Sequence, residues 1–145
     1  MEPQIESKIN LDILESVLPP VFRRYNPEKD YDFVISLCKE CNISPPDTNI
    51  ICAFVSEVEG QIVAFCSLLI NHFVEPLVVK SNLPLITKVK ISDGLIFMVG
   101  GVASYLGIPR LYFIAREDNQ RFVNFVQRQF QVREFVESKI YMVEL

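Results

Sequence analysis

The sequence predicts a single α+β domain built on a mixed, mostly antiparallel sheet flanked by helices. Two β-branched, apolar runs, 48–58 and 61–70, flank Glu59-Gly60, a dipeptide typical of tight hairpins. A long apolar run, 94–109, precedes a short β-prone run, 110–115, which indicates a helix followed by a strand. The chain therefore combines an antiparallel hairpin with a strand that follows a helix, which is the pattern of an α+β domain with a mixed sheet.

The composition supports one globular domain and argues against two classes of partner. The 145 residues are 50% hydrophobic and 22% charged, which is enough to bury a core. The formal net charge of −4 disfavours general attraction to nucleic acid or to an anionic membrane. The run 94–109 is too short to span a bilayer and contains glycines, so it predicts a buried helix. We therefore expect no nucleic-acid partner and no membrane partner.

The cysteines predict a reducing location. The chain has 4 cysteines at irregular spacings, which is not the pattern of a disulfide-rich secreted scaffold. The Met1 end also carries no basic segment followed by an apolar run. We expect a cytoplasmic protein, or part of a larger intracellular or virion-type assembly.

Residues 1–20 are expected to form a helical extension before a domain at 21–145. Asn10 is a candidate cap and Pro19-Pro20 a stop. Five apolar residues share one helical face: Ile9, Ile13, Leu14, Val17 and Leu18. This face must be covered either by the chain's own domain, which is the favoured interpretation, or by a partner on which the segment docks.

The first part of the domain predicts a strand, a helix and a hairpin. Residues 21–25 are strand-like, and Asn26-Pro27 then supplies a cap and a proline at the first helical position. Val34, Leu37, Cys38 and Cys41 follow at helical spacing, so the helix is expected to bury that face until residues 44–47 end the segment. The hairpin follows.

The second part predicts alternating strands and helices. Residues 73–79 should form a strand and 80–90 an irregular loop, with Ser92-Asp93 capping a helix that ends at Gly107. After the strand 110–115, Asn119 is expected to cap a last helix that extends to about Phe130. Residues 135–145 should close the chain as one strand.

This order of elements resembles the GCN5-related N-acetyltransferase (GNAT) fold over residues 21–145. The resemblance is carried by segments that each match the family weakly but occur in the family's order. They are the hairpin 51–69, the strand 75–79, the helix and strand within 94–115, the segment 119–125 that begins with asparagine, and the final strand 139–145.

The resemblance implies a site for acetyl-coenzyme A, with a Gln/Arg-x-x-Gly-x-Gly/Ala loop opening the long helix so that backbone N–H groups cradle the pyrophosphate. Counting back from Arg110 places this loop on residues 87–92, where Thr87 replaces Gln/Arg, Lys90 the first glycine and Ser92 the second small residue. The coenzyme-binding residues that the resemblance implies, if coenzyme A binds, are Leu77, Val78, Val79, Thr87, Lys88, Val89, Lys90, Ile91, Ser92 and Asn119.

The family's general acid is missing. A tyrosine often follows the aromatic residue that ends the segment starting at Asn119, but here Phe125 is followed by Val126, which cannot transfer a proton. Glu75 and Tyr112 are weak catalytic candidates, because strand carboxylates and tyrosines are more often structural and neither matches a family motif.

Other groupings favour structural interpretations. Cys38-x-x-Cys41 has no second pair and His72 is the only histidine, so buried thiols are expected rather than a metal site. Gly100-Gly101 lies within a helix, where close packing on the sheet explains it better than nucleotide binding. Arginines of the last third should line a solvated helix face or a protein-recognition surface: Arg116, Arg121, Arg128 and Arg133.

Two functions remain open from the sequence. The favoured one is a GNAT-like protein with a degenerate coenzyme loop that acts as a binding, structural or assembly module, with a protein partner or as a homo-oligomer. The other is an active N-acetyltransferase that moves acetyl from acetyl-coenzyme A to an amine of a small molecule or protein.

Overall fold

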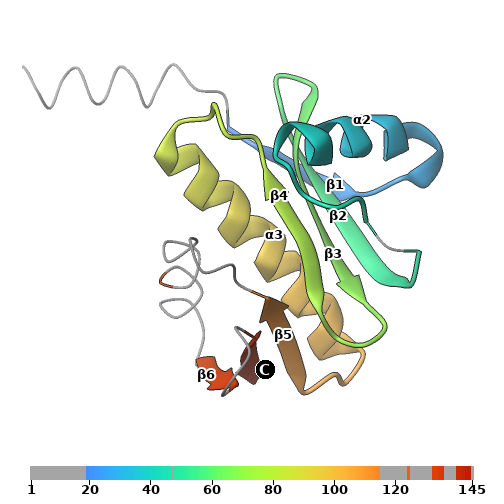
Figure 1. The fold of residues 1–145 in the computed structure, drawn as a ribbon, viewed down its shortest axis with the longest axis vertical. Helices are drawn as coiled ribbons and strands as arrows, with labels where there is room; N and C mark the ends of the chain where they lie inside the picture. The colour runs from blue at the N-terminus through green and yellow to red at the C-terminus, as the bar shows by residue number, and fades with distance from the viewer. Residues whose placement is uncertain (1–18, 47, 115–123, 125–131, 136–139, 145) are drawn as a thin grey trace, which may run out of the picture.

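The computed structural model describes residues 19–46, 48–114, 124, 132–135 and 140–144 (Figure 1). The elements in chain order are β1 (Val21–Arg24), α2 (Pro27–Glu40), β2 (Ile50–Val58), β3 (Gln61–Leu69), β4 (Val74–Val79), α3 (Leu85–Tyr105), β5 (Arg110–Ile114), β6 (Val132–Phe135) and β7 (Ile140–Glu144). The predicted α+β class is confirmed. Residues 1–18 of the predicted helical extension 1–20, and the predicted helix start at Asn119, lie outside the described residues.

The strands form two sheets joined at one point. One sheet is antiparallel in the order β1-β2-β3-β4, and the other has the order β5-β7-β6. A single parallel bridge pairs Phe73 with Tyr112, and the Tyr112 N–H donates to the His72 carbonyl over 3.0 Å. The aromatic rings of Phe73 and Tyr112 stack with centroids 5.4 Å apart. This bridge makes the arrangement mixed, as predicted, because β4 and β5 run in the same direction.

The first helix begins where the sequence predicts. Asn26 adopts an extended conformation, and its side-chain oxygen accepts a hydrogen bond from the Glu28 N–H over 3.0 Å. Pro27 occupies the first turn, where its missing N–H costs nothing. Val34, Leu37 and Cys38 are buried together with side chains of β2 and β3, so this helix covers one face of the four-stranded sheet.

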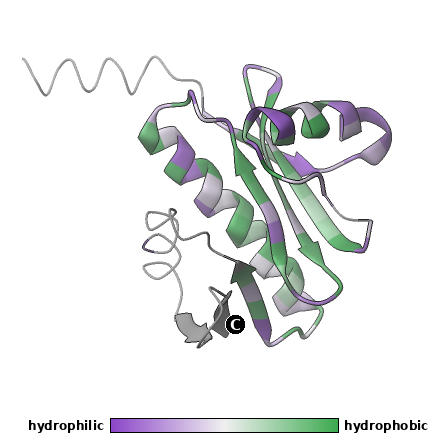
Figure 2. Cartoon of the chain, viewed as in Figure 1, coloured by the Kyte–Doolittle hydropathy of each residue, from purple (hydrophilic) through white to green (hydrophobic). Residues whose placement is uncertain are grey.

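The hairpin between β2 and β3 also forms as predicted. Glu59 and Gly60 have φ values of 53° and 76°, the left-handed pair that matches the twist of two antiparallel strands. Alternate residues of the paired strands then face opposite sides. Val55 and Phe65 pack beneath α2, whereas Phe54 and Cys66 pack beneath α3. Hydrophobic residues accordingly line much of β3 and the middle of α3 (Figure 2).

Helix α3 starts earlier than the sequence predicts. The expected loop at 80–90 and the expected cap at Ser92-Asp93 are wrong, because α3 begins at Leu85 with Pro84 as its N-cap residue. Thr87, Ile91 and Leu95, at intervals of four residues, are all buried, so the buried stripe of the helix begins before Ser92. Burial of this stripe outweighs the local capping signal. At its other end the helix finishes at Tyr105 with Leu106 as its C-cap residue, and Gly107 has φ 72°, which agrees with the expected end at Gly107.

The end of the chain differs from the single predicted strand at 135–145. Phe135 ends β6, and β7 begins at Ile140. The two strands pair antiparallel with Val132 opposite Val143 and Phe135 opposite Ile140, while β7 also pairs with β5. The residues predicted as one strand therefore belong to two neighbouring strands. No helix of the described residues has the length and apolar character needed to cross a membrane.

Among the glycines of α3, Gly94 has a packing role that the sequence does not reveal, whereas Gly100 and Gly101 do not. A Cβ at Gly100 or Gly101 would meet no atom within 4 Å, so close packing on the sheet does not explain this pair. A Cβ at Gly94 would instead collide with the Phe22 ring of β1. The absence of a side chain at Gly94 therefore allows β1 to pack beneath α3.

We expect Gly94→Ala and Gly101→Ala to change stability in opposite directions. The first adds a methyl group where Phe22 already lies, and such overpacking costs about 1–3 kcal/mol. The second adds a methyl group in open space within a helix, and replacing glycine there stabilises by about 0.5–1 kcal/mol. Urea unfolding of both variants measures the difference, and equal effects of the two substitutions would contradict the packing described for Gly94.

Candidate functional site

The first part of the candidate site is a bend in β4. Between the pairs Cys66–Leu77 and Leu68–Val74, β3 advances by two residues while β4 spans three, so β4 carries an extra residue there. Such a bulge bends a strand and increases its twist. The bulge follows the Phe73–Tyr112 bridge directly, and in the described part of the chain no strand pairs with β4 beyond it on the β5 side. In the described residues, β4 and β5 therefore share one backbone bridge, and their pairing does not continue beyond it.

The end of this pairing leaves backbone groups of β4 facing away from β3. The Lys80 N–H donates to the Val63 carbonyl over 2.8 Å, and Val78 lies opposite Phe65 in the same register. Because hydrogen-bonded positions alternate in an antiparallel ladder, the backbone groups of Leu77 and Val79 point to the other side. The Val79 carbonyl accepts a weak contact from the Cys41 thiol at 3.5 Å. The other backbone N–H and C=O groups on this side of β4 can form hydrogen bonds with an extended chain that contains amides.

The second part of the site is the start of α3, which begins at Leu85, shortly after β4 ends at Val79. The N-cap residue Pro84 provides no side-chain hydrogen bond, and the Lys88 N–H is the first to bond within the helix, to the Pro84 carbonyl over 3.0 Å. The N–H groups of Leu85, Ile86 and Thr87 are therefore the uncapped donors of this helix. A helix end with free N–H groups attracts anions, and Lys80 and Lys88 add positive charge nearby in the sequence.

Of the coenzyme-binding residues that the sequence resemblance implies, those that the structure describes lie on two different elements, α3 and β4. Residues 87–92 do not form a loop but lie within α3, where Thr87 and Ile91 are buried in the core. Lys88 and Ser92 are half-buried, whereas Val89 and Lys90 are exposed on the outer side of the helix. Leu77, Val78 and Val79 lie on β4, with Val78 buried. Asn119 lies outside the described residues.

The two weak catalytic candidates lie on β4 and β5. Glu75 is half-buried beside the bulge, and its backbone carbonyl accepts a hydrogen bond of 2.6 Å from the Ser67 hydroxyl. The Tyr112 ring is stacked on Phe73 at the bridge between the two sheets. The Glu75 contact involves the backbone and not the carboxylate, so the catalytic roles of Glu75 and Tyr112 stay predictions.

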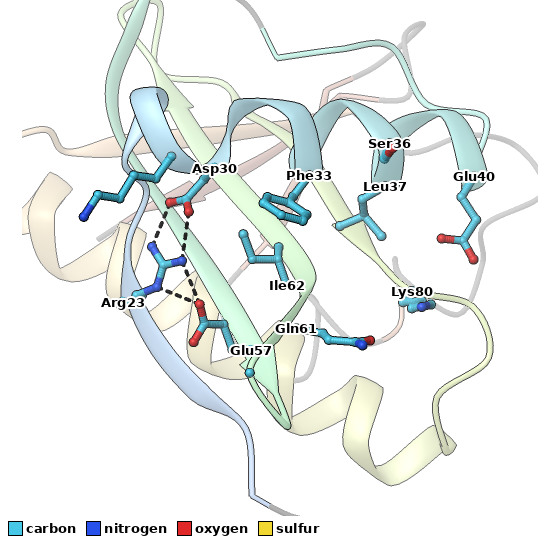
Figure 3. Close-up of a pocket in the computed structure, with 12 residues that line it drawn as sticks. Arg23, Asp30, Phe33, Ser36, Leu37, Glu40, Glu57, Gln61, Ile62 and Lys80 are labelled. Atoms are coloured by element: carbon cyan, nitrogen blue, oxygen red, sulfur yellow. Dashed lines mark hydrogen bonds and ion pairs between the residues drawn. The ribbon is translucent and has the colours of Figure 1, made fainter.

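A separate cavity of about 510 Å³ lies between α2 and the hairpin end of β2 and β3 (Figure 3). Its floor is apolar and consists of Phe33, Leu37 and Ile62, while charged side chains stand at both ends. Glu40 and Lys80 lie at one end, and an arginine with two carboxylates lies at the other.

Arg23 organises the charged end of this cavity. Its Nη1 and Nη2 atoms donate to the two carboxylate oxygens of Asp30 over 2.7 and 2.9 Å, a bidentate pair. Its Nε and Nη2 atoms also donate to Glu57 over 2.9 and 2.7 Å. Asp30 accepts a further bond from the Asn26 N–H over 2.8 Å, which links the network to the start of α2. The network thus joins β1, α2 and β2.

These hydrogen bonds shift the protonation equilibria of the network. The bonds from Arg23 lower the pKa of Asp30, although burial of that carboxyl opposes the shift. The bonds to Asp30 and Glu57 raise the pKa of the Arg23 guanidinium. Asp30 therefore stays ionised at neutral pH, and Arg23 has its donors directed at carboxylates of the protein.

Asp30→Asn tests this network through the pH dependence of stability. Because the pKa of Asp30 is lowered in the folded state, its contribution is complete above the unfolded pKa of about 3.9 and is lost as pH falls below it. We expect the variant to be less stable than the wild type by about 1–3 kcal/mol at pH 7, with the gap narrowing below about pH 4. Chemical denaturation across pH 2.5–7 measures the gap.

The control is Asp32→Asn on the exposed side of the same helix, which should change stability by no more than about 0.5 kcal/mol. A gap for Asp30→Asn that stays constant as the solution is acidified would contradict the proposed role of the carboxylate.

The thiols lack the features of a reactive or metal-binding site. Burial raises the pKa of the Cys38, Cys41, Cys52 and Cys66 thiols, which are all free. Raised pKa values keep thiols protonated and poorly nucleophilic. In residues 19–46 and 48–114, and in the short described pieces beyond them, no three His, Cys, Asp or Glu side chains gather in a way that could hold a metal ion.

The Arg23 network and the true start of α3 are the parts of the site that sequence reasoning missed. Arg23 and Glu57 are 34 positions apart, and no local pattern connects them. The buried spacing Thr87, Ile91, Leu95 is the signal that predicts the earlier helix start when it is given more weight than Ser92-Asp93.

Comparison with solved structures identifies the fold. The chain is similar to PaiA N-acetyltransferase from Thermoplasma acidophilum in complex with coenzyme A, with a TM-score of 0.68 and 15% identity over 88% of this chain and 100% of that one. It is also similar to a GNAT-family acetyltransferase from Staphylococcus aureus, with a TM-score of 0.66 and 16% identity over 87% and 99% of the two chains.

A further similarity is to N-acetylglutamate synthase from Neisseria gonorrhoeae, complexed with coenzyme A and N-acetylglutamate. The TM-score is 0.63 with 17% identity, over 88% of this chain and 35% of that one. No protein-family model matches the sequence, and no curated protein matches it. The chain has the GNAT acetyltransferase fold, as its sequence predicts.

Proposed function

We propose that this protein is a GNAT-fold binding or assembly module that does not catalyse acetyl transfer. The observation that carries the proposal is the first turn of α3, where Pro84 is followed by the exposed apolar side chains of Leu85 and Ile86. The resemblance implies a glycine-containing backbone at this helix start, which lets a pyrophosphate approach closely. Here no glycine occurs between Gly60 and Gly94, so every residue near the helix start carries a side chain.

The lack of an identifiable proton donor supports the same function. Val126 occupies the position at which the resemblance implies a tyrosine, and the Tyr112 ring is stacked on Phe73. The fold itself does not depend on either feature, because its core is formed by α2, α3 and the four-stranded sheet. We propose that the protein acts through contacts with another protein chain, as a homo-oligomer or assembly component within the cell.

Isothermal titration calorimetry of the full chain with acetyl-coenzyme A, and with coenzyme A alone, tests the proposal. We expect no saturable heat and no rise in melting temperature at millimolar ligand, because binding to the native state alone would stabilise it. Micromolar or tighter binding of acetyl-coenzyme A would overturn the module function.

The second candidate function is an N-acetyltransferase that uses acetyl-coenzyme A and an amine acceptor. It is favoured by the short stretch of chain between the open edge of β4, which ends at Val79, and the three uncapped N–H groups of Leu85, Ile86 and Thr87. A phosphate at the helix start and an extended amide chain along β4 would satisfy both sets of groups. The solved structure of PaiA N-acetyltransferase with coenzyme A supports this alternative for the fold.

Leu85→Pro tests the alternative if titration detects binding. Proline at the first helical position removes one uncapped N–H but fits the helix geometry, and the extended conformation of Pro84, with ψ 146°, suits a following proline. If the helix start holds the pyrophosphate, affinity should fall by about tenfold, because a hydrogen bond to a charged group contributes about 1.5–3 kcal/mol. Leu85→Ala, which keeps the N–H, is the matched control. Equal affinities of the two variants would place the ligand elsewhere.

A further inference from the structure

The outer side of α3 carries an exposed apolar ridge. Residues at intervals of four, from Leu85 through Val89, Asp93, Phe97 and Gly101 to Tyr105, all face solvent. The exposed fractions of the four large apolar side chains are 65% for Leu85, 43% for Val89, 78% for Phe97 and 90% for Tyr105. A ridge at this spacing is the surface that a second helix packs against.

The first half of this ridge has a distinct charge. Ile86 widens the apolar strip beside Leu85 and Val89 with an exposed fraction of 46%. Lys88 and Lys90 flank the strip, and the uncapped N-terminus of the helix adds further positive potential. The surface therefore fits an amphipathic segment that is apolar on one side and acidic overall.

The chain's own N-terminal segment has this chemistry. Residues 1–18 contain four acidic residues, Glu2, Glu6, Asp12 and Glu15, against one basic residue, Lys8, which gives a side-chain charge of −4 + 1 = −3. The five apolar residues that share one helical face occupy positions 9–18 of the same segment. Apolar pattern and charge thus both complement the first half of α3.

The segment joins the domain at the same end of the sheet as the start of α3. Val21 lies opposite Glu57, next to the hairpin turn at Glu59-Gly60, and Lys80 pairs with Val63 on the other strand of that hairpin. The starts of β1 and α3 accordingly lie at one end of the domain in Figure 1. Ten helical residues extend about 15 Å, which is comparable to the length of the first half of α3.

We propose that residues 9–18 form an amphipathic helix that docks on Leu85, Ile86 and Val89 of the same molecule. Only Pro19 and Pro20 separate the segment from β1, so its effective concentration at this surface is high and favours binding within one molecule over binding between copies. The docked segment brings carboxylates to the positive end of α3 and covers its first turn. This inference does not rest on the proposed function, because it concerns a contact within the chain that forms without coenzyme.

A single tryptophan reports on the contact, because the chain contains no Trp. In the full-length Val89→Trp variant, we expect emission at short wavelength and weak quenching by acrylamide, independent of protein concentration. Adding Leu14→Asp, which places a charge on the apolar face of the segment, should shift the emission to longer wavelength and increase the quenching constant several-fold. Adding Lys90→Glu should produce a smaller shift in the same direction.

Phe97→Trp is the matched control on the same ridge, outside the covered half, and Leu14→Asp should not change its emission. Circular dichroism of each variant checks that the fold is retained. The proposal would be overturned if the Val89→Trp variant showed the emission of an exposed indole. It would also be overturned if the emission remained that of a buried indole after Leu14→Asp was added. Burial that grows with protein concentration would overturn it in favour of docking between two copies. None of these outcomes depends on coenzyme binding, so they are separate from the titration result.

Discussion

The bend in β4 is the constraint on which the rest of the site depends. One extra residue opposite Cys66 to Leu68 turns β4 away from β5 just after the two strands meet at Phe73 and Tyr112. The sheet therefore divides in two, and the second half of β4 keeps backbone groups that do not face β3. Because α3 begins at Leu85, shortly after β4 ends at Val79, the free helix end and the free strand edge lie next to each other in the chain.

The fold and the chemistry of the site are supported by different residues. The cores on the two faces of the sheet are built from side chains of α2, α3 and the central strands, and they require only apolar residues at alternating or helical spacing. Coenzyme binding requires in addition a backbone that a phosphate can approach, and the proposed function assigns this place to the first turn of α3, which begins with Leu85 and Ile86. The chain keeps the GNAT fold at 15% identity to a protein solved in complex with coenzyme A, so the fold by itself does not determine whether the helix start binds coenzyme.

Local backbone signals predicted much of the fold. Asn26-Pro27, Glu59-Gly60 and Gly107 each specify a conformation through their own chemistry, and each occupies the expected position. The start of α3 was misplaced because Ser92-Asp93 has the composition of a cap, whereas burial of Thr87 and Ile91 in the tertiary structure decides the boundary. Gly94 and the Arg23 network were not predicted either, since their partners Phe22 and Glu57 lie far away in the sequence.

The backbone amides of Leu85, Ile86 and Thr87 offer the most direct test of the central claim that the fold is retained while the coenzyme seat is closed. We would record their NMR chemical shifts in the full-length protein during a titration with coenzyme A. The account predicts that these three resonances do not move at millimolar ligand. Saturable shifts concentrated at these amides and along Leu77 to Val79 would contradict it and would establish a working coenzyme site.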